Sequence, residues 1–525
     1  MDVADVRTGR RPPRPSAVAP HLDAPPRRRR PLIGAAIAGA VLAGVALRFW
    51  TTSDLWLDEA LTVNIARLPL GDIPGALRHD GSPPLYYFLL HGWIRLFGDG
   101  DVAVRALSGV LGVAALPLVW VAGRRLAGRT VAWTAVVLLA TSPFGIRFGT
   151  EARMYSLVTL LTLLGCVALL SVLESPSPRH LAGLAAVTGG LLLTHYWALY
   201  LAVAVAMPLL FLARRGRKAH RARLALLAMA GGSLLFLPWV PTFLSQLRHT
   251  GTPWAEPATF QAMVNAVSEF AGGVGDAGRG LAVLILVVAG LAVFGRPIDG
   301  RRIELDLRTQ PRGRGLAFVV AATLIVAIAV GLVTGSGYAP RYTAVVFGLF
   351  ILLIALGITV FTDLRIRYGV VAVAVLLGLA AGVENVTEQR TQAGEIAAAI
   401  VAQAEPGDVV GYCPDQLGPG VSRLLPPAYP QLTFPRAEPP TIVDWVDYDD
   451  RVNAADPVAF ADLLARRAGP GHDIFLVWSG AYRTHEGVCE EIVVRLSTGR
   501  ATTRLVQARP TKFFEHAELQ RFQPR

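Results

Sequence analysis

The sequence predicts a polytopic α-helical membrane protein with about eleven transmembrane helices, followed by an extracytoplasmic α/β domain. Hydrophobic residues make up 53% of the 525 residues and charged residues only 17%, whereas soluble proteins carry about 25% charged residues. Several apolar runs approach the roughly 20 residues needed to cross a bilayer. After residue 384 the apolar runs shorten, and proline and charge increase.

The formal net charge of +12 raises the question of nucleic-acid binding. Most of this charge lies in short segments between apolar runs, where arginine is an orientation signal. Basic and aromatic residues do not form the groove pattern typical of nucleic-acid binding. The composition therefore favours a lipid bilayer as partner and excludes nucleic acid.

Residues 1–30 are rich in proline and arginine, and we expect a disordered cytoplasmic tail. The apolar run that follows, residues 31–50, is long and has no cleavage site before a soluble domain, so it predicts an uncleaved first helix rather than a signal peptide. The whole transmembrane domain is expected over residues 31–384. Its later helices are expected at 105–123, 131–147, 155–173, 182–197, 198–213, 224–243, 280–295, 315–335, 342–361 and 368–384.

The loops between these runs alternate in arginine content. The arginine-rich set contains GRRLAGR, ARRGRKAHRAR, GRPIDGRRIELDLRTQPRGRG and DLRIR, and the other set contains WLDEALTVN, FGTEARMY, LRHTGTPWAEP and GSGYAPRY. The positive-inside rule places the first set and the N-terminus in the cytoplasm, so an odd helix count puts residues 385–525 outside the plasma membrane. If residues 182–213 were one tilted helix, every later loop would change sides, but the later arginine bias argues against this.

Residues 385–525 alternate between helix-like and strand-like segments, which predicts a small α/β domain. AGEIAAAIVAQA reads as a helix and DVVGYC as a strand, and PVAFADLLARRA and HDIFLVWSG repeat that order. In an oxidising compartment Cys413 and Cys489 are expected to form a disulfide, with two free buried thiols as the alternative. The cysteine spacing does not indicate a metal site.

Ionisable residues gather at the outer ends of several predicted helices, where they are functional candidates. The first external loop, residues 51–104, has an apolar and aromatic composition that suggests helices lying on the membrane surface. The candidates are Asp58, Glu59, His79, Asp80, Glu151, Arg153, His195, Tyr196, Tyr338 and Arg341.

Carboxylates and arginines beside lipid indicate sugar transfer from a polyprenyl phosphate. Arginine binds phosphate oxygens through two parallel hydrogen bonds, and a carboxylate accepts the proton of an attacking hydroxyl. Arginines directed at the leaving phosphate stabilise the charge that grows in the transition state. The acceptor hydroxyl is expected on a protein, a lipid or a glycan.

The segment LWLDEA, residues 55–60, resembles the Asp-Glu motif of the GT-C glycosyltransferases. The narrower likeness is to bacterial relatives of the protein O-mannosyltransferases and of the lipid A aminoarabinose transferase. SPPLYYFLLHGWIRLFGDGDVAVRALSGVLG is similar to that family's first loop and second helix, with Ser82 where a His often precedes the proline pair. EARMYSL and APRY resemble later landmarks, and the resemblance spans about residues 31–345.

The resemblance implies that Asp58 acts as the base and that Glu59 supports it. It also implies that Arg153 and Arg341 contact the phosphate of a polyprenyl-phosphate monosaccharide of the mannose or arabinose type. Tyr338, close to Arg341 in sequence, is a further phosphate candidate. Contacts with the substrate are expected from His79, Asp80, Glu151, His195 and Tyr196.

Simpler roles compete with these. Asp58 can cap a surface helix, and Glu151 can pair with Arg153. Arg341 can anchor its helix by snorkelling, and the tyrosines can belong to an aromatic belt. No cofactor is required, although Asp58, Glu59, Glu151 and His79 offer ligands for a divalent metal.

Two other functions stay open: a transporter or flippase of lipid-linked sugars, and a non-catalytic factor of cell-envelope assembly. Transporters often show internal repeats and broken helices near the midplane, whereas here no repeat relates the two halves and the charges gather at the outer face. A scaffold has no need for a converging acid and arginines.

Overall fold

The structure is a computed structural model that describes residues 30–250, 259–273, 275–299, 302–335 and 337–525. The tail predicted over residues 1–30 lies outside this part of the chain, apart from Arg30. The first helix is α1 (Arg30–Leu47). The described residues 30–39 belong to one compact unit and residues 40–525 to a second.

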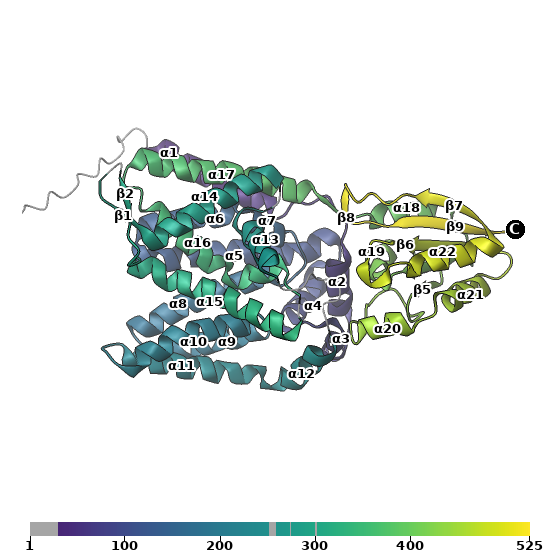
Figure 1. Cartoon of the computed structure of the whole chain (residues 1–525), viewed down its shortest axis with the longest axis horizontal. Coiled ribbons are helices and arrows are strands. Elements are labelled where there is room, and N and C mark those ends of the chain that lie inside the picture. Colours follow the sequence, from purple (N-terminus) through teal and green to yellow (C-terminus); the bar gives the residue numbers. More distant parts are fainter. Residues whose placement is uncertain (1–29, 251–258, 274, 300–301, 336) are drawn as a thin grey trace, which may run out of the picture. The chain divides into compact units, whose positions relative to one another are not determined.

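Each of the eleven predicted apolar runs coincides with a helical segment (Figure 1). After α1 these are α5 (Asp101–Ala127), α6 (Arg129–Thr141) with α7 (Pro143–Gly149), α8 (Tyr155–Glu174), α9 (Pro178–Leu192), α10 (Ala198–Arg214), α11 (Ala219–Ser233) with η2 (Leu234–Trp239) and α12 (Val240–His249), α14 (Gly275–Phe294), α15 (Pro311–Thr334), η3 (Pro340–Thr343) with α16 (Ala344–Ile358), and α17 (Leu364–Thr387).

Among the described residues, seven helices are long and apolar enough to cross a membrane, or eight if α6 and α7 form one span. These two helices meet at an angle of 56°, because Ser142 leaves the helical conformation and Pro143 begins the next helix. The predicted helical membrane protein is thus confirmed, while the number of spans stays a prediction. The stretch 182–213 forms two helices, α9 and α10.

The first loop folds into three short helices, α2 (Leu57–Arg67), α3 (Ile73–Asp80) and α4 (Leu85–Phe97). Gly81 ends α3 with φ of 84°, a left-handed conformation that glycine adopts without strain. A further helix, α13 (Phe260–Gly272), was not predicted from the sequence. Between α14 and α15 lies a hairpin of β1 (Gly295–Pro297) and β2 (Ile303–Leu305).

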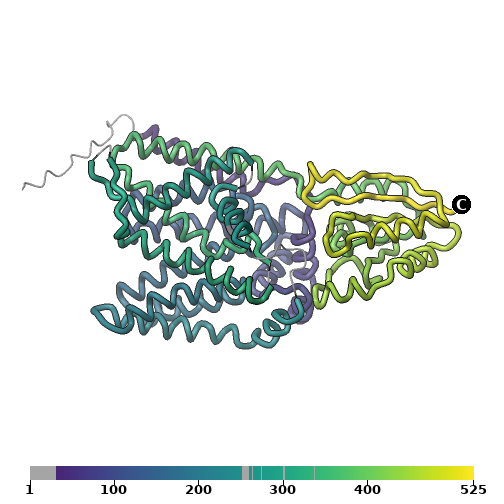
Figure 2. The backbone as a smooth tube through the Cα atoms, viewed as in Figure 1, coloured from purple at the N-terminus to yellow at the C-terminus, as the bar shows by residue number. Residues whose placement is uncertain are grey.

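The C-terminal domain contains a five-stranded sheet in the order β5-β4-β6-β9-β7, so the predicted α/β domain is confirmed. Its strands are β4 (Val409–Cys413), β5 (Gln431–Thr433), β6 (Ile474–Trp478), β7 (Arg500–Val506) and β9 (Glu518–Pro524). The first three are parallel, while β9 is antiparallel to β6 and β7. Figure 2 follows the backbone from the purple first helices to these yellow and green elements.

Helices pack on both faces of this sheet, because side chains alternate along β4. Val410 joins a core with Ile396 of α18 (Ala393–Gln403), and Val409 joins another with Leu464 of α21 (Pro457–Ala468). The other helical segments of the domain are η4 (Asp415–Leu417), α19 (Gly418–Ser422), α20 (Tyr448–Ala454), η5 (Arg483–His485) and α22 (Val488–Gly499).

Two further features tie the domain together. Cys413, at the end of β4, forms a disulfide with Cys489 of α22, with their Cα atoms 5.6 Å apart. A short parallel ladder pairs β3 (Gln389–Thr391), which directly follows α17, with β8 (Phe513–Glu515). This ladder joins the end of the helical part to the last segment of the chain.

Candidate active site

Asp58 lies in the first turn of α2, beside two arginines from distant segments. Its Oδ2 is 3.5 Å from Nη2 of Arg341 in η3 and 4.0 Å from Nη2 of Arg153 in the loop between α7 and α8. All three side chains are largely buried, with exposed fractions of 17%, 18% and 11%. Within the described residues Asp58 Oδ2 has no hydrogen-bond partner, so this carboxylate oxygen is not committed to the fold.

A chain of hydrogen bonds holds Arg153 in place. Arg153 Nη1 donates to Thr62 Oγ1 at 2.7 Å and to the Tyr87 hydroxyl at 3.4 Å. Tyr87 in turn donates to Asp80 Oδ2 at 2.6 Å, and Thr62 donates to the carbonyl oxygen of Asp58 at 2.7 Å. Asp80 therefore acts on the site through Tyr87, and α2, α3 and α4 together orient the guanidinium.

Aromatic rings surround Arg341. Its Cζ lies 5.8 Å from the ring centroids of both Trp56 and Tyr342. A guanidinium within about 6 Å of a ring is attracted by the electrons of the ring face. Trp56 is next to the helix that bears Asp58, so the same segment provides a carboxylate and a ring for this arginine.

His195 and Tyr338 lie in the same aromatic group. The ring of His195 is 5.3 Å from that of Tyr342 and 6.0 Å from that of Tyr155, and Tyr338 packs against Trp197 at 5.2 Å. The backbone N–H of Trp197 donates to His195 Nδ1 at 3.1 Å. This nitrogen therefore carries no proton, and the imidazole is neutral. The buried hydroxyl of Tyr338 has no hydrogen-bond partner in the part of the chain described.

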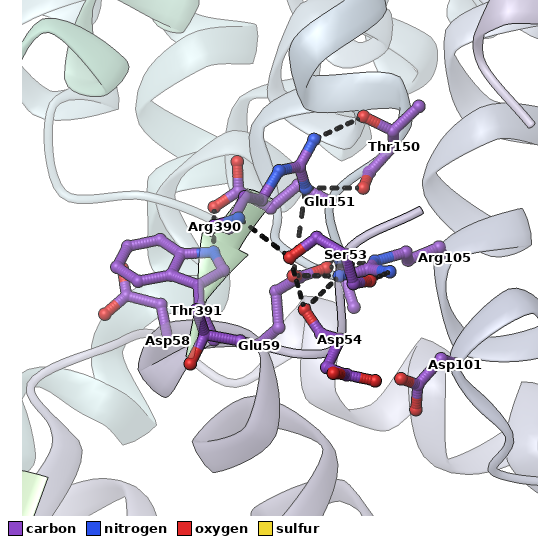
Figure 3. A network of polar contacts seen from close by, with 12 residues as sticks. Ser53, Asp54, Asp58, Glu59, Asp101, Arg105, Thr150, Glu151, Arg390 and Thr391 are labelled. Carbon is purple, nitrogen blue, oxygen red and sulfur yellow. Dashed lines mark hydrogen bonds and ion pairs between the residues drawn. The ribbon is translucent and has the colours of Figure 1, made fainter. Parts of the chain in front are cut away.

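Glu59 points away from Asp58 into a buried ion network (Figure 3). It accepts from Arg105 Nε at 2.7 Å and Nη2 at 2.6 Å, and from the backbone N–H of Ala152 at 2.9 Å. Arg390 Nη1 lies 3.8 Å away. Burial alone would raise the pKa of Glu59, but the charges of Arg105 and Arg390 outweigh it and lower the pKa. Glu59 thus anchors α2 as a carboxylate.

Glu151 is also buried, at 2% exposure. It accepts a hydrogen bond from Trp56 Nε1 at 3.1 Å, and its charged neighbour is Arg147 at 3.9 Å rather than Arg153. Burial raises the pKa of this carboxyl. Its contacts fix the indole ring that lies beside Arg341.

Part of the sequence matches a known family, and the fold is similar to those of solved structures. Residues 81–241 match the family model described as dolichyl-phosphate-mannose-protein mannosyltransferase. ArnT from Cupriavidus metallidurans in the apo state is 12% identical with a TM-score of 0.61, over 93% of this chain and 98% of that chain. The same enzyme bound to undecaprenyl phosphate gives 14% identity, a TM-score of 0.58 and the same coverage.

The archaeal oligosaccharyltransferase AglB from Archaeoglobus fulgidus, in complex with an inhibitory peptide and a dolichol-phosphate, is 10% identical with a TM-score of 0.50, over 93% of this chain and 74% of that chain. No curated protein matches the chain. The chain has the GT-C fold. The predicted GT-C fold is thereby confirmed, and the family match over residues 81–241 agrees with the predicted likeness to protein O-mannosyltransferases.

Two of the predicted substrate-contacting residues of this GT-C protein tie other elements together. His79 is half exposed, and its Nδ1 lies 2.9 Å from Asp444 Oδ1 in the C-terminal domain. The Tyr196 hydroxyl donates to Gln246 of α12 and accepts from Trp239 Nε1. In the described ranges no group of three or more His, Cys, Asp or Glu is placed to hold a metal ion.

The C-terminal domain borders the GT-C site. Tyr482, in the turn after β6, has its pKa raised by burial and by the negative charges of Glu515, Asp415 and Asp58. Glu515, in β8 of the same domain, accepts a hydrogen bond from the backbone N–H of Leu57, the residue before Asp58, at 2.8 Å.

Sequence reasoning missed three residues that build this site: Arg105, Arg390 and Glu515. An arginine at position 105, within an apolar helical run, was a signal for a buried partner. No pattern in the sequence indicated that residues 390 and 515 contact α2 and the segments around it.

Proposed function

We propose that this protein transfers a monosaccharide from a polyprenyl-phosphate donor to an acceptor hydroxyl at the outer face of the plasma membrane. The observation that carries the proposal is the position of Asp58 Oδ2, between Arg341 and Arg153 and without a hydrogen bond of its own in the described residues. A base and two phosphate-binding groups are the parts that this reaction requires.

In the proposed reaction Asp58 takes the proton of the acceptor hydroxyl while its oxygen attacks the anomeric carbon. The bond from that carbon to the phosphate oxygen breaks on the opposite side, so the configuration inverts. The polyprenyl phosphate leaves as an anion, and Arg153 and Arg341 stabilise the charge that it gains. At 3.5 and 4.0 Å, both ion pairs with Asp58 are longer than charge-assisted hydrogen bonds of about 2.7–2.9 Å, so neither is a tight pair.

The donor class is supported by two similar proteins. The matching family is described by a dolichyl-phosphate-mannose donor, and ArnT has been seen with undecaprenyl phosphate. We therefore infer a sugar of the mannose or arabinose type on a polyprenyl phosphate. The acceptor, a protein, lipid or glycan hydroxyl, is proposed to approach between α2 and the turn that bears Tyr482.

The external position of this site is part of the proposal. It is supported by the arginine-rich loops on the opposite side and by the disulfide of the C-terminal domain, because disulfides persist in oxidising compartments.

The proposal is tested with Asp58→Asn in the full chain, reconstituted with mannosyl undecaprenyl phosphate and a membrane extract as acceptor source. The matched control is Asp72→Asn, an exposed acid of the same loop. We expect release of undecaprenyl phosphate to fall about 100-fold or more in Asp58→Asn, the usual contribution of a general base, and to stay unchanged in the control. A transporter or assembly factor would tolerate both changes, and equal turnover in the two variants would refute the proposal.

A further inference from the structure

The helix that bears Asp58 begins without a cap of its own. Trp56 occupies the N-cap position of α2 and, within the described chain, makes no side-chain cap hydrogen bond. The first N–H groups of a helix lack partners within the helix and favour a carboxylate close by. Here the backbone N–H of Leu57 donates to Glu515 Oε2 at 2.8 Å. The cap of α2 is therefore supplied by β8, close to the C-terminal end of the chain.

The Glu515 carboxylate is fixed from its other side as well. Thr391 Oγ1 donates to Glu515 Oε1 at 2.9 Å, and the two residues are register partners in the β3–β8 ladder. The N–H of Gln392 donates to the carbonyl oxygen of Glu515 at 2.9 Å. Glu515 is 7% exposed, so its position is set by backbone pairing and two side-chain bonds rather than by solvent.

The β3–β8 ladder also contacts the segments around Asp58. The N–H of Arg390 donates to Ser53 Oγ at 2.8 Å, and its guanidinium donates to the carbonyl oxygen and hydroxyl of Thr150 at 2.8 and 2.7 Å (Figure 3). The ring of Phe514 meets Trp56 edge-on at 5.6 Å. One β ladder thus contacts both the start of α2 and the loop that leads to Arg153.

We propose that Glu515 is a positioning residue of the transfer reaction, which holds the first turn of α2 so that Asp58 stays between Arg153 and Arg341. This inference rests on the proposed function. A displacement of about 1 Å at a reacting group can cost on the order of 100-fold in rate, so a cap on the turn that bears the base affects catalysis directly.

The Glu515 carboxyl is buried and has other acids nearby. The pKa of Glu515 is raised to about 7, mainly by burial and also by the charges of Asp58 and Glu59, against the opposing hydrogen bonds from Leu57 and Thr391. Ionised Glu515 is therefore costly above pH 7, whereas a glutamine would retain an acceptor oxygen for Leu57 at no such cost.

The test compares Glu515→Ala and Glu515→Gln in the full chain, with Glu395→Gln as a control for the same change at a more exposed site of this domain. Turnover of mannosyl undecaprenyl phosphate gives kcat and KM, and amide hydrogen exchange reports on residues 55–62. In Glu515→Ala we expect faster exchange at Leu57 and Asp58 and a kcat lower by about 10- to 100-fold, with KM changed less than about twofold.

In Glu515→Gln we expect exchange close to wild type and a kcat within about threefold, because the amide oxygen still accepts from Leu57. A loss of kcat at nearly constant KM in Glu515→Ala that Glu515→Gln restores is a result that loss of folded protein would not give. Wild-type kcat and exchange in Glu515→Ala, with Asp58→Asn inactive, would overturn this inference alone. Retained turnover in Asp58→Asn would overturn the proposed function instead.

Discussion

Arg341 in η3 and Asp58 in the first turn of α2 form an ion pair, with Arg341 Nη2 3.5 Å from Asp58 Oδ2. The ring centroids of Trp56 and Tyr342 each lie 5.8 Å from the Arg341 guanidinium carbon. A planar guanidinium satisfies both environments at once, since it stacks on rings and still presents N–H groups at its edge. This geometry suits a group that binds a phosphate beside Asp58, the proposed base.

Arg341→Lys is expected to weaken donor binding, because an ammonium neither stacks between two rings nor forms two parallel bonds to phosphate. We expect the affinity for undecaprenyl phosphate, measured by tryptophan fluorescence, to fall about tenfold, equal to the loss of roughly 1.4 kcal/mol. Arg95→Lys, at an exposed arginine of α4, is the control. Equal affinities in the two variants would remove Arg341 from the phosphate site.

Arg105→Met is expected to destabilise the protein by about 3–5 kcal/mol, because it leaves the fully buried carboxylate of Glu59 without its main partner. Thermal unfolding in detergent measures the change. Arg67→Met removes an exposed ion pair with Asp99, whose side chains are 52% and 43% exposed, and should cost at most about 1 kcal/mol. Similar losses in both variants would contradict a structural role for the buried network.

The sequence sufficed to predict the eleven apolar helical runs, although not α13, because the hydrophobicity and length of a run such as residues 342–361 are local properties that indicate a helix. It also indicated that Asp58, Arg153 and Arg341 belong together, because each stands at an outer helix end. The two adjacent acids were distinguished only by the family resemblance, and the fold shows the physical difference: Asp58 faces the arginines while Glu59 turns to Arg105.

Sequence patterns could not predict the contacts between the helical part of the chain and the C-terminal domain. His79 pairs with Asp444, and Leu57 with Glu515, so in each case the partner lies in a domain whose placement no periodicity encodes. The predicted substrate contacts of His79 and Tyr196 stay predictions.

The predicted orientation of the chain places the Arg215–Lys218 segment in the cytoplasm and the C-terminal domain outside. Alkaline phosphatase fused after residue 525 should be active, and a fusion after residue 217 should be inactive, because the enzyme folds only where disulfides form. A green fluorescent protein fused at the same two points serves as the control with the opposite dependence. The reverse pattern would invert the topology and place the candidate site in the cytosol.

The stability of the C-terminal domain should depend on pH through Asp415. Burial raises the pKa of this carboxyl to about 7, above its ordinary value of about 4. Between these values the folded state binds more protons than the unfolded state, so the free energy of unfolding falls as the pH rises from about 4 to 7. Asp415→Asn keeps an acceptor oxygen for the Tyr448 hydroxyl and cannot ionise. We therefore expect the decrease in Tm between pH 5 and 8 to be smaller in this variant, and its Tm at pH 8 to exceed that of the wild type.

Asp449→Asn, at an exposed acid of α20, should leave the slope of Tm against pH unchanged. An identical slope in all three proteins would show that Asp415 does not titrate in this range, and the buried contact with Tyr448 would then have to hold the carboxylate at no cost.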